Sequence, residues 1–294
     1  MANLKEIRGR ISSIKSTRQI TSAMKMVSAA KLRKAQDNII QLRPFAHKLQ
    51  DILIDISNNL MLLEDSDYVK TRDLSRILLV VITSNKGLCG AFNANVIKRT
   101  IQCINEDYSG KLEKSKIDII TIGKKGSEFF KNKGYNVIGR FDEIYDKLTY
   151  DEIVPVAKMI TSDFLKGKYD KVELIYNRFK NAAMQELKVS QLLPLKPVII
   201  DENVQKEINN YIFEPSEKEI MLQLIPRVIR INFYKSLLDS FASEHGARMT
   251  AMHKATDNAT ELIKDLTLLY NKARQASITN EILEIVGGAN ALKG

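Results

Sequence analysis

Cysteine and histidine are scarce in this chain of 294 residues, which contains two cysteines and three histidines. Cys89 and Cys103 are too few for a disulfide framework or a four-cysteine zinc site. The histidines are scattered along the chain, at His47, His245 and His253. We therefore expect no structural metal, and we interpret His245 and Met249 as part of a partly buried helix face rather than as a ligand pair.

Long hydrophobic runs and a leader segment are also missing. The longest strongly apolar run covers residues 77–82, whereas a helix that crosses a bilayer needs about 20 such residues. The N-terminus carries charges from residue 5 onward and has no apolar core, so it does not resemble a secretory signal. The expected location is the cytoplasm.

Proline is missing from both ends of the chain. The six prolines are Pro44, Pro155, Pro194, Pro197, Pro215 and Pro226. Because proline breaks or kinks helices, its absence leaves both ends free to form long ones.

Acidic residues are scarce in the first 48 residues, which contain eleven basic side chains and only two acidic ones, Glu6 and Asp37. This excess of nine positive charges is nearly the whole net charge of +10. Such a basic stripe attracts phosphate backbones, anionic lipids or acidic protein surfaces, and charge alone does not choose among them.

The apolar pattern predicts a long N-terminal helix over residues 1–62, with Asn3 as N-cap and Glu6 three residues on. Pro44 should kink this helix rather than end it, since the stripe continues past it. With a shift of phase before Ile20, the stripe runs through Leu4, Ile7, Ile11, Ile14, Ile20, Met24, Val27, Leu32, Ala35, Ile39, Leu42, Phe45, Leu49, Ile52, Ile56 and Leu60.

Residues 207–294 predict a second long helix. Its apolar pattern extends from about residue 220 to residue 285, which corresponds to a helix on the order of 100 Å long. A heptad seam runs through Phe241, His245, Met249, Met252, Thr256, Ala259, Ile263, Leu266, Tyr270 and Ala273. Each long helix has one narrow apolar stripe, and packing the two helices against each other buries both stripes. We therefore expect an antiparallel coiled coil.

Residues 73–200 alternate between strand-like and helix-like segments. Strands are predicted at 77–84, 116–123, 135–141, 171–179 and 186–195, and helices at 92–106, 124–133 and 151–166. This alternation is typical of a parallel-rich sheet with crossover helices. The predicted fold class is therefore α/β, with a Rossmann-like domain inserted between the arms of the coiled coil and a final hairpin or edge strand.

A glycine-containing loop follows the first predicted strand, in the stretch VVITSNKGLCGAFNANV. A phosphate-binding P-loop needs the pattern GxxxxGK[ST], but here Lys86 precedes Gly87 and Gly90. The third glycine of a dinucleotide site is missing as well. We interpret the glycines as a tight turn in which Asn85 or Asn93 satisfies backbone groups.

No set of residues predicts catalysis. Cys89 lies where a helix N-terminus would favour a thiolate, but the inserted domain contains no histidine to pair with it. The carboxylate pairs Asp142-Glu143 and Asp151-Glu152 fit solvated caps better than an acid–base pair.

Three motifs resemble those of the gamma subunit of F-type ATP synthase of the bacterial type. They are MKMVSAAKLRKAQ at 24–36, SNKGLCGAFN at 84–93 and ARQASITNEILEIVGGANAL at 273–292, in the order and spacing of that family. The resemblance implies a long antiparallel coiled coil with an inserted α/β foot. It also implies a rotary shaft without a catalytic site, which transmits torque between an ion-driven ring of c subunits and a catalytic ring of alpha and beta subunits.

The resemblance also carries over particular residues. Contacts with the beta subunit are expected at Met24, Lys25, Arg274, Gln275 and Thr279. A C-terminal tip seated in an apolar sleeve of the catalytic ring is expected to include Ile285, Val286 and Leu292. Gly287 and Gly288 would end the helix there. A turn of the foot, near a c-ring or epsilon contact, would contain Lys86, Gly87 and Gly90.

The implied partners are the alpha, beta and epsilon subunits and the c-ring, with one copy of this chain per complex and no nucleic acid. No cofactor is expected on this chain, because nucleotide and magnesium belong to partner subunits. The implied place is peripheral, on the cytoplasmic side of a bacterial inner membrane, since the sequence starts on its helix without a transit peptide.

Two alternatives from other classes stay open. One is a Rossmann-like nucleotide-binding enzyme with coiled-coil dimerisation arms. The other is a basic coiled coil that binds nucleic acid, although residues 1–44 contain no aromatic side chain for base stacking.

Overall fold

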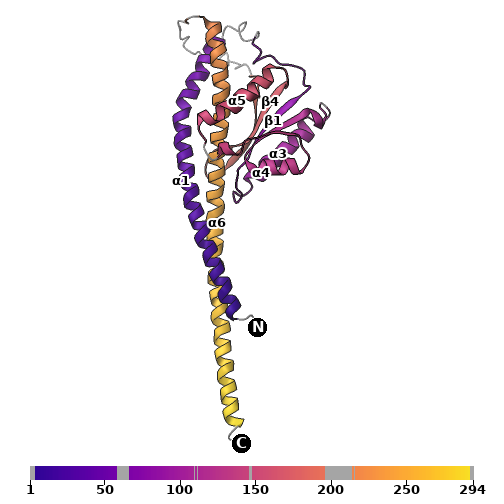
Figure 1. Cartoon of the computed structure of the whole chain (residues 1–294). Helices are drawn as coiled ribbons and strands as arrows, with labels where there is room; N and C mark the ends of the chain where they lie inside the picture. The colour runs from indigo at the N-terminus through magenta and orange to yellow at the C-terminus, as the bar shows by residue number, and fades with distance from the viewer. Residues whose placement is uncertain are drawn as a thin grey trace. The chain divides into compact units, whose positions relative to one another are not determined.

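The chain forms two compact units, Met1–Ser28 with Met249–Gly294, and Ala29–Arg248. We call them the helical unit and the sheet unit. Two long helices, α1 (Leu4–Ser57) and α6 (Glu217–Ala291), contribute to both (Figure 1). The computed structural model describes residues 4–57, 66–108, 110, 112–145, 148–195, 214 and 216–291.

The sheet unit contains a five-stranded sheet with the order β3-β2-β1-β4-β5. Its strands are β1 (Ile77–Ile82), β2 (Ile117–Ile122), β3 (Val137–Arg140), β4 (Lys171–Phe179) and β5 (Gln185–Leu193). The pairs β1–β2, β1–β4 and β2–β3 are parallel, and β5 is antiparallel to β4. The predicted parallel-rich sheet with a final hairpin is confirmed.

Three helices cross between the parallel strands, as the alternation of segments predicts. They are α3 (Phe92–Gln102), α4 (Lys124–Asn132) and α5 (Tyr150–Leu165). The first differs from the prediction, because its last turn changes into a π-helix at Cys103–Asp107. In Figure 1, α3 and α4 lie on the side of the sheet away from α6.

The core follows from the two-residue period of the strands, in which alternate side chains point to opposite faces. All six residues of β1 are fully buried, as expected for the centre of a sheet covered on both sides. One face packs with α3 and α4 through Ile77, Leu79, Val81, Val96 and Phe130. The other packs with α5 and α6 through Leu78, Val80, Ile82, Ile160 and Phe233.

The helical unit pairs α1 and α6 in antiparallel directions. The hydroxyl oxygens of Thr21 and Thr256 are 2.8 Å apart, and Lys25 Nζ lies 3.3 Å from His253 Nδ1. The predicted seam of α6 is confirmed from Met249 to Ala273, where its eight residues are all buried or half-buried. Its first two residues, Phe241 and His245, belong to the sheet unit instead. From residue 257 to residue 290, the side chains that are not exposed are Ala259, Ile263, Leu266, Tyr270, Ala273 and Ser277.

The predicted phase shift in the stripe of α1 is wrong. Ile20, Val27 and Phe45 are more than half exposed. The heptad spacing instead continues without a shift, through polar residues that are buried or half-buried: Arg18, Thr21, Lys25 and Ser28. The apolar pattern missed this part of the seam because hydrogen-bonding side chains occupy it.

The ends of the long helices also differ from the prediction. Helix α6 runs through Gly287 and Gly288 to Ala291. Neither glycine has the left-handed φ that a helix-ending C-cap needs, so the expectation that they end the helix is wrong. Helix α1 continues through Pro44, as predicted. Predictions for residues 58–62, 196–200 and 207–213, and for Leu292, lie outside the described residues.

Candidate functional site

An outer apolar face of α1 lies beside the polar seam. Ile20 and Val27, with exposed fractions of 60% and 57%, are seven residues apart and therefore lie on the same side of the helix. Met26 is 65% exposed next to them. Exposed basic side chains precede this face on the same helix, at Arg8, Arg10 and Lys15. A helix that turns polar residues to its partner helix and apolar residues outward is arranged for contact with another chain.

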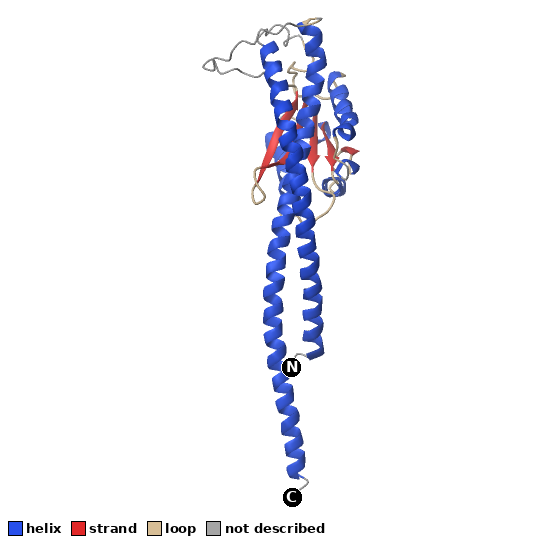
Figure 2. Ribbon diagram, turned by 90° about the vertical axis from the view of Figure 1, so that its left-hand side faces the viewer, coloured by secondary structure: helices blue, strands red, loops and turns tan. Residues whose placement is uncertain are grey.

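The last turns of α6 form a second exposed apolar region in the helical unit. In Figure 2 the C-terminal end of α6 continues beyond the N-terminal end of α1. The large apolar side chains of this segment are about half exposed or more: Ile278, Ile282, Leu283, Ile285 and Val286. A row of large apolar residues without cover is unusual on an isolated soluble chain and marks an interaction surface.

The residues predicted to contact a beta subunit all lie in the helical unit, at two separate positions along the helix axis. Met24 and Lys25 are half-buried on α1, and His253, the partner of Lys25, lies 3.5 Å from Asp257. Arg274, Gln275 and Thr279 are exposed on α6. His253 and Arg274 are 21 positions apart in the sequence, which corresponds to about 30 Å along the helix.

The glycine loop forms the tight turn that the sequence predicts, from β1 to α3. Leu88 and Gly90 have left-handed φ angles of 62° and 59°. The backbone N–H of Ser84 donates to Asn93 Oδ1 at 2.9 Å, and the Ser84 hydroxyl donates to the Lys86 carbonyl at 2.7 Å. The three residues predicted to form this turn, Lys86, Gly87 and Gly90, are all exposed.

The thiol of Cys89 is turned inward from this loop. Its residue is 1% exposed, and Asn93 Nδ2 lies 3.3 Å from its sulfur. Burial raises the pKa of the Cys89 thiol, which disfavours the thiolate that nucleophilic chemistry requires.

Hydrogen bonds within the chain span the edge at which an open α/β sheet would hold a nucleotide. Such ligands bind where the strand order reverses, at the carboxyl ends of the strands, and here that point lies between β1 and β4. Asn177, near the end of β4, donates to the Phe92 carbonyl at 3.1 Å, and its own carbonyl accepts from Ser243 of α6 at 3.0 Å. Asn177 thus bonds to the start of α3 and to α6 across this edge.

A buried charged cluster on α6 closes the same edge. Arg248 Nη1 lies 2.5 Å from Glu244 Oε1, and both side chains are less than a tenth exposed. His245 is 5% exposed, and burial, with the positive charges of Arg248 and Lys31, lowers its pKa to about 3. The sequence analysis missed Glu244 and Arg248; their spacing of four residues was the only signal, and it is typical of exposed helix pairs.

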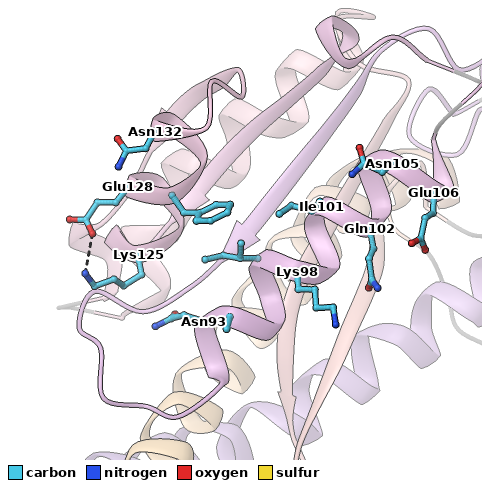
Figure 3. Close-up of a pocket in the computed structure, with 12 residues that line it drawn as sticks. Asn93, Lys98, Ile101, Gln102, Asn105, Glu106, Lys125, Glu128 and Asn132 are labelled. Carbon is cyan, nitrogen blue, oxygen red and sulfur yellow. Dashed lines mark hydrogen bonds and ion pairs between the residues drawn. The ribbon is translucent and has the colours of Figure 1, made fainter.

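A hollow of the sheet unit lies between α3 and α4 (Figure 3). It has a volume of about 840 Å³, and its apolar lining consists of Ala94, Ile97, Ile101 and Phe129. On its rim Lys125 Nζ pairs with Glu128 at 3.0 Å. Among the residues that the structure describes, no three potential metal ligands gather at this hollow or elsewhere. None of the described helices is both long and apolar enough to span a bilayer.

Comparison with known proteins agrees with this arrangement. A family model described as ATP synthase matches residues 3–292. The ATP synthase gamma chains of Flavobacterium johnsoniae and Flavobacterium psychrophilum are 56% and 55% identical over 294 residues, and each alignment covers all of both chains.

Solved structures show the same architecture. The central stalk and c-ring structure of the Tetrahymena thermophila mitochondrial ATP synthase contains a chain that is 26% identical, with a TM-score of 0.57, over 80% of this chain and 99% of that one. A rotor chain of the Euglena gracilis enzyme shares the fold, with a TM-score of 0.64 and 20% identity, over 94% and 98% of the two chains. The fold and the family matches define a central-stalk subunit. The chain belongs to the ATP synthase gamma chain family and is a component of the ATP synthase complex.

Proposed function

We propose that this chain is the rotating shaft of its ATP synthase, carrying torque between an ion-driven c-ring and a catalytic ring of alpha and beta subunits. It has no catalytic site of its own in this proposal. One observation supports it most strongly: large apolar residues of the helical unit face outward on α1 and on the end of α6, while polar residues occupy the α1 seam between Arg18 and Ser28. This surface suits a shaft that turns inside a ring of other chains.

The end of α6 is the part that we place in an apolar sleeve of the catalytic ring. Ile285 is 71% exposed and Val286 is 50% exposed, so a sleeve would cover side chains that water covers in the free chain. The hydrophobic effect favours this burial without fixing a rotational angle, because it is not directional.

The basic surface of α1 gives the shaft an electrostatic attraction for acidic levers of the beta subunit. Met24 and Lys25 belong to this contact zone in our proposal. Attraction between exposed charges is screened beyond about 8–10 Å at physiological salt, so the stripe acts only on levers that approach closely. We place the sheet unit at the other partners, the c-ring and the epsilon subunit, through a surface that includes the Lys86 loop.

The chain is proposed to be peripheral, with one copy per complex, on the cytoplasmic side of a bacterial inner membrane. The similarity to bacterial gamma chains over the full length supports this placement. In this proposal nucleotide and magnesium belong to the partner subunits.

Replacing Arg274 with alanine should weaken coupling in the assembled complex more than it weakens the free chain. The side chain is exposed on α6, and hydrogen bonds to charged groups contribute about 1.5–3 kcal/mol, so ion-driven ATP synthesis should fall about tenfold. The free energy of unfolding of the isolated chain should change by less than about 0.5 kcal/mol. Synthesis and hydrolysis in reconstituted vesicles, with urea unfolding of the free chain, check both expectations.

Lys272→Ala is the matched control, because Lys272 is another exposed basic residue on the same turn region of α6. It should leave synthesis close to the wild-type rate. Unchanged synthesis and hydrolysis in the Arg274→Ala complex would remove this residue from the proposed contact. Saturable ATP binding by the isolated chain, abolished by Lys86→Ala, would favour the enzyme alternative instead.

A further inference from the structure

Arg248 forms an ion pair with Glu244 and also donates hydrogen bonds to the glycine loop. Arg248 Nη2 donates to the Lys86 carbonyl at 2.8 Å and to the Gly87 carbonyl at 3.2 Å, and its Nε lies 3.3 Å from the Gly87 oxygen. One guanidinium therefore binds a carboxylate on its own helix and two successive carbonyls of a loop that is about 160 residues away in the chain.

The loop needs such a holder because its backbone is in a sparsely populated conformation. Leu88 has a φ of 62° although it is not a glycine, and its side chain is 65% exposed, so its own packing does little to maintain that angle. On the β1 side the loop is tied by Ser84 and Asn93. On the α6 side the hydrogen bonds from Arg248 are the described side-chain bonds to its carbonyls.

Glu244 and Arg248 depend on each other at this depth. A buried guanidinium without a carboxylate would be an uncompensated charge in a medium of low dielectric constant. The planar, forked guanidinium can reach several acceptors at once, whereas the single ammonium group of a lysine lacks this geometry.

We propose that Arg248, held by Glu244, is a positioning residue that clamps residues 85–90 onto α6. The clamp fixes the strained turn, so that the side chains of Lys86 and Leu88 project outward at a constant angle to the helix. If the proposed shaft function is correct, the loop and the helix then turn as one body, and this consequence alone rests on that function.

Alkylation of Cys89 in the full chain tests the clamp. In the wild-type chain the thiol is buried beneath the loop, so its reaction with iodoacetamide under native conditions should be slow. Arg248→Met removes the donors to the loop, and the opened loop should raise the alkylation rate of Cys89 about tenfold, as local opening raises exchange rates. Cys103, which is also buried, should stay slow and report any global unfolding; mass spectrometry resolves the two sites.

A double variant separates positioning from general stability. Arg248→Met alone leaves the Glu244 carboxylate buried beside a methionine, which should lower the unfolding midpoint. Glu244→Leu with Arg248→Met removes both charges, a change that is often neutral or stabilising at buried pairs, so the midpoint should recover. Cys89 should nevertheless remain about tenfold faster than in the wild type, because the loop still lacks its donors.

Two outcomes would overturn the clamp. One is a double variant in which Cys89 protection returns together with stability, which would make the pair a stabilising element only. The other is an Arg248→Met chain in which Cys89 stays as slow as in the wild type. Neither outcome affects the shaft proposal, which depends on the Arg274 measurements in the assembled complex.

Discussion

Replacement of Gly123 with alanine is expected to lower the free energy of unfolding of the sheet unit by about 4 kcal/mol or more. Gly123 directly follows β2 and has a φ of 99°, in the region that side chains rarely adopt. A Cβ atom there would collide with the backbone carbonyl of Thr83, just beyond the end of β1. The Thr83 N–H donates to the Ile122 carbonyl at 2.8 Å, so the backbone cannot retreat without loss of this bond.

Urea unfolding followed by circular dichroism measures the effect, and Gly134→Ala is the matched control. Gly134 also has a left-handed φ, of 74°, but no heavy atom lies within 4 Å of the point that an added Cβ would occupy. The control should therefore show only the backbone cost, about 1–2 kcal/mol. Equal losses in the two variants would mean that the collision with Thr83 is relieved by a small shift.

Acidification from pH 7 to pH 4 is expected to destabilise the sheet unit in a way that depends on His245. The ring lies 4.4 Å from the ring of Phe241, and burial with the nearby Arg248 and Lys31 lowers the His245 pKa to about 3. In the unfolded chain the pKa of histidine is about 6.5. Between these two pKa values, His245 is protonated in the unfolded chain and neutral in the folded chain. The free energy of unfolding therefore falls as the pH falls.

The size of this effect follows from proton linkage. One proton bound only in the unfolded state gives a slope of about 1.4 kcal/mol per pH unit, present below pH 6.5 or so and absent above it. Unfolding midpoints at pH 7, 6, 5 and 4 should therefore fall less steeply in His245→Gln than in the wild type. Comparison of the two chains cancels the contributions of shared groups such as Asp239, whose pKa burial raises.

His253→Gln is the control for the pH series. His253 lies in the helical unit and its side chain is 57% exposed, so this variant controls for the loss of a histidine away from the Phe241 ring. Identical slopes for the wild type and His245→Gln would show that the ring accepts its proton without unfolding.

Much of the fold was predictable because burial here follows simple periods. Strand β1 is an unbroken apolar run, and the seam of α6 repeats at spacings of three and four from Phe241 to Ala273. The same rule failed on α1 between Arg18 and Ser28. There the seam is polar, and two of its side chains have partners more than 200 residues away, Thr256 for Thr21 and His253 for Lys25.

The candidate surfaces were predictable only in part, for a related reason. The family motifs indicated Arg274, Gln275 and Thr279, and the structure exposes all three on α6. The clamp residue Arg248 was not found, because a glutamate and an arginine four residues apart look like an exposed pair until the loop that covers them is known. Burial of charge is a tertiary property, and no local pattern encodes it.

The polar residues in the α1 seam also fix the axial register between α1 and α6. If α1 slid by one heptad along α6, Thr21 would face Met249 or Ile263 rather than Thr256. Its hydroxyl would then lose its partner on the other helix and keep only its bond to the Arg18 carbonyl. Lys25 would lose His253 in the same slip. An all-apolar seam would tolerate several such alignments, whereas these two pairs accept one. This register fixes the separation of Lys25 on α1 and Arg274 on α6 along the helix axis. A partner chain that contacts both residues therefore always meets them at the same separation.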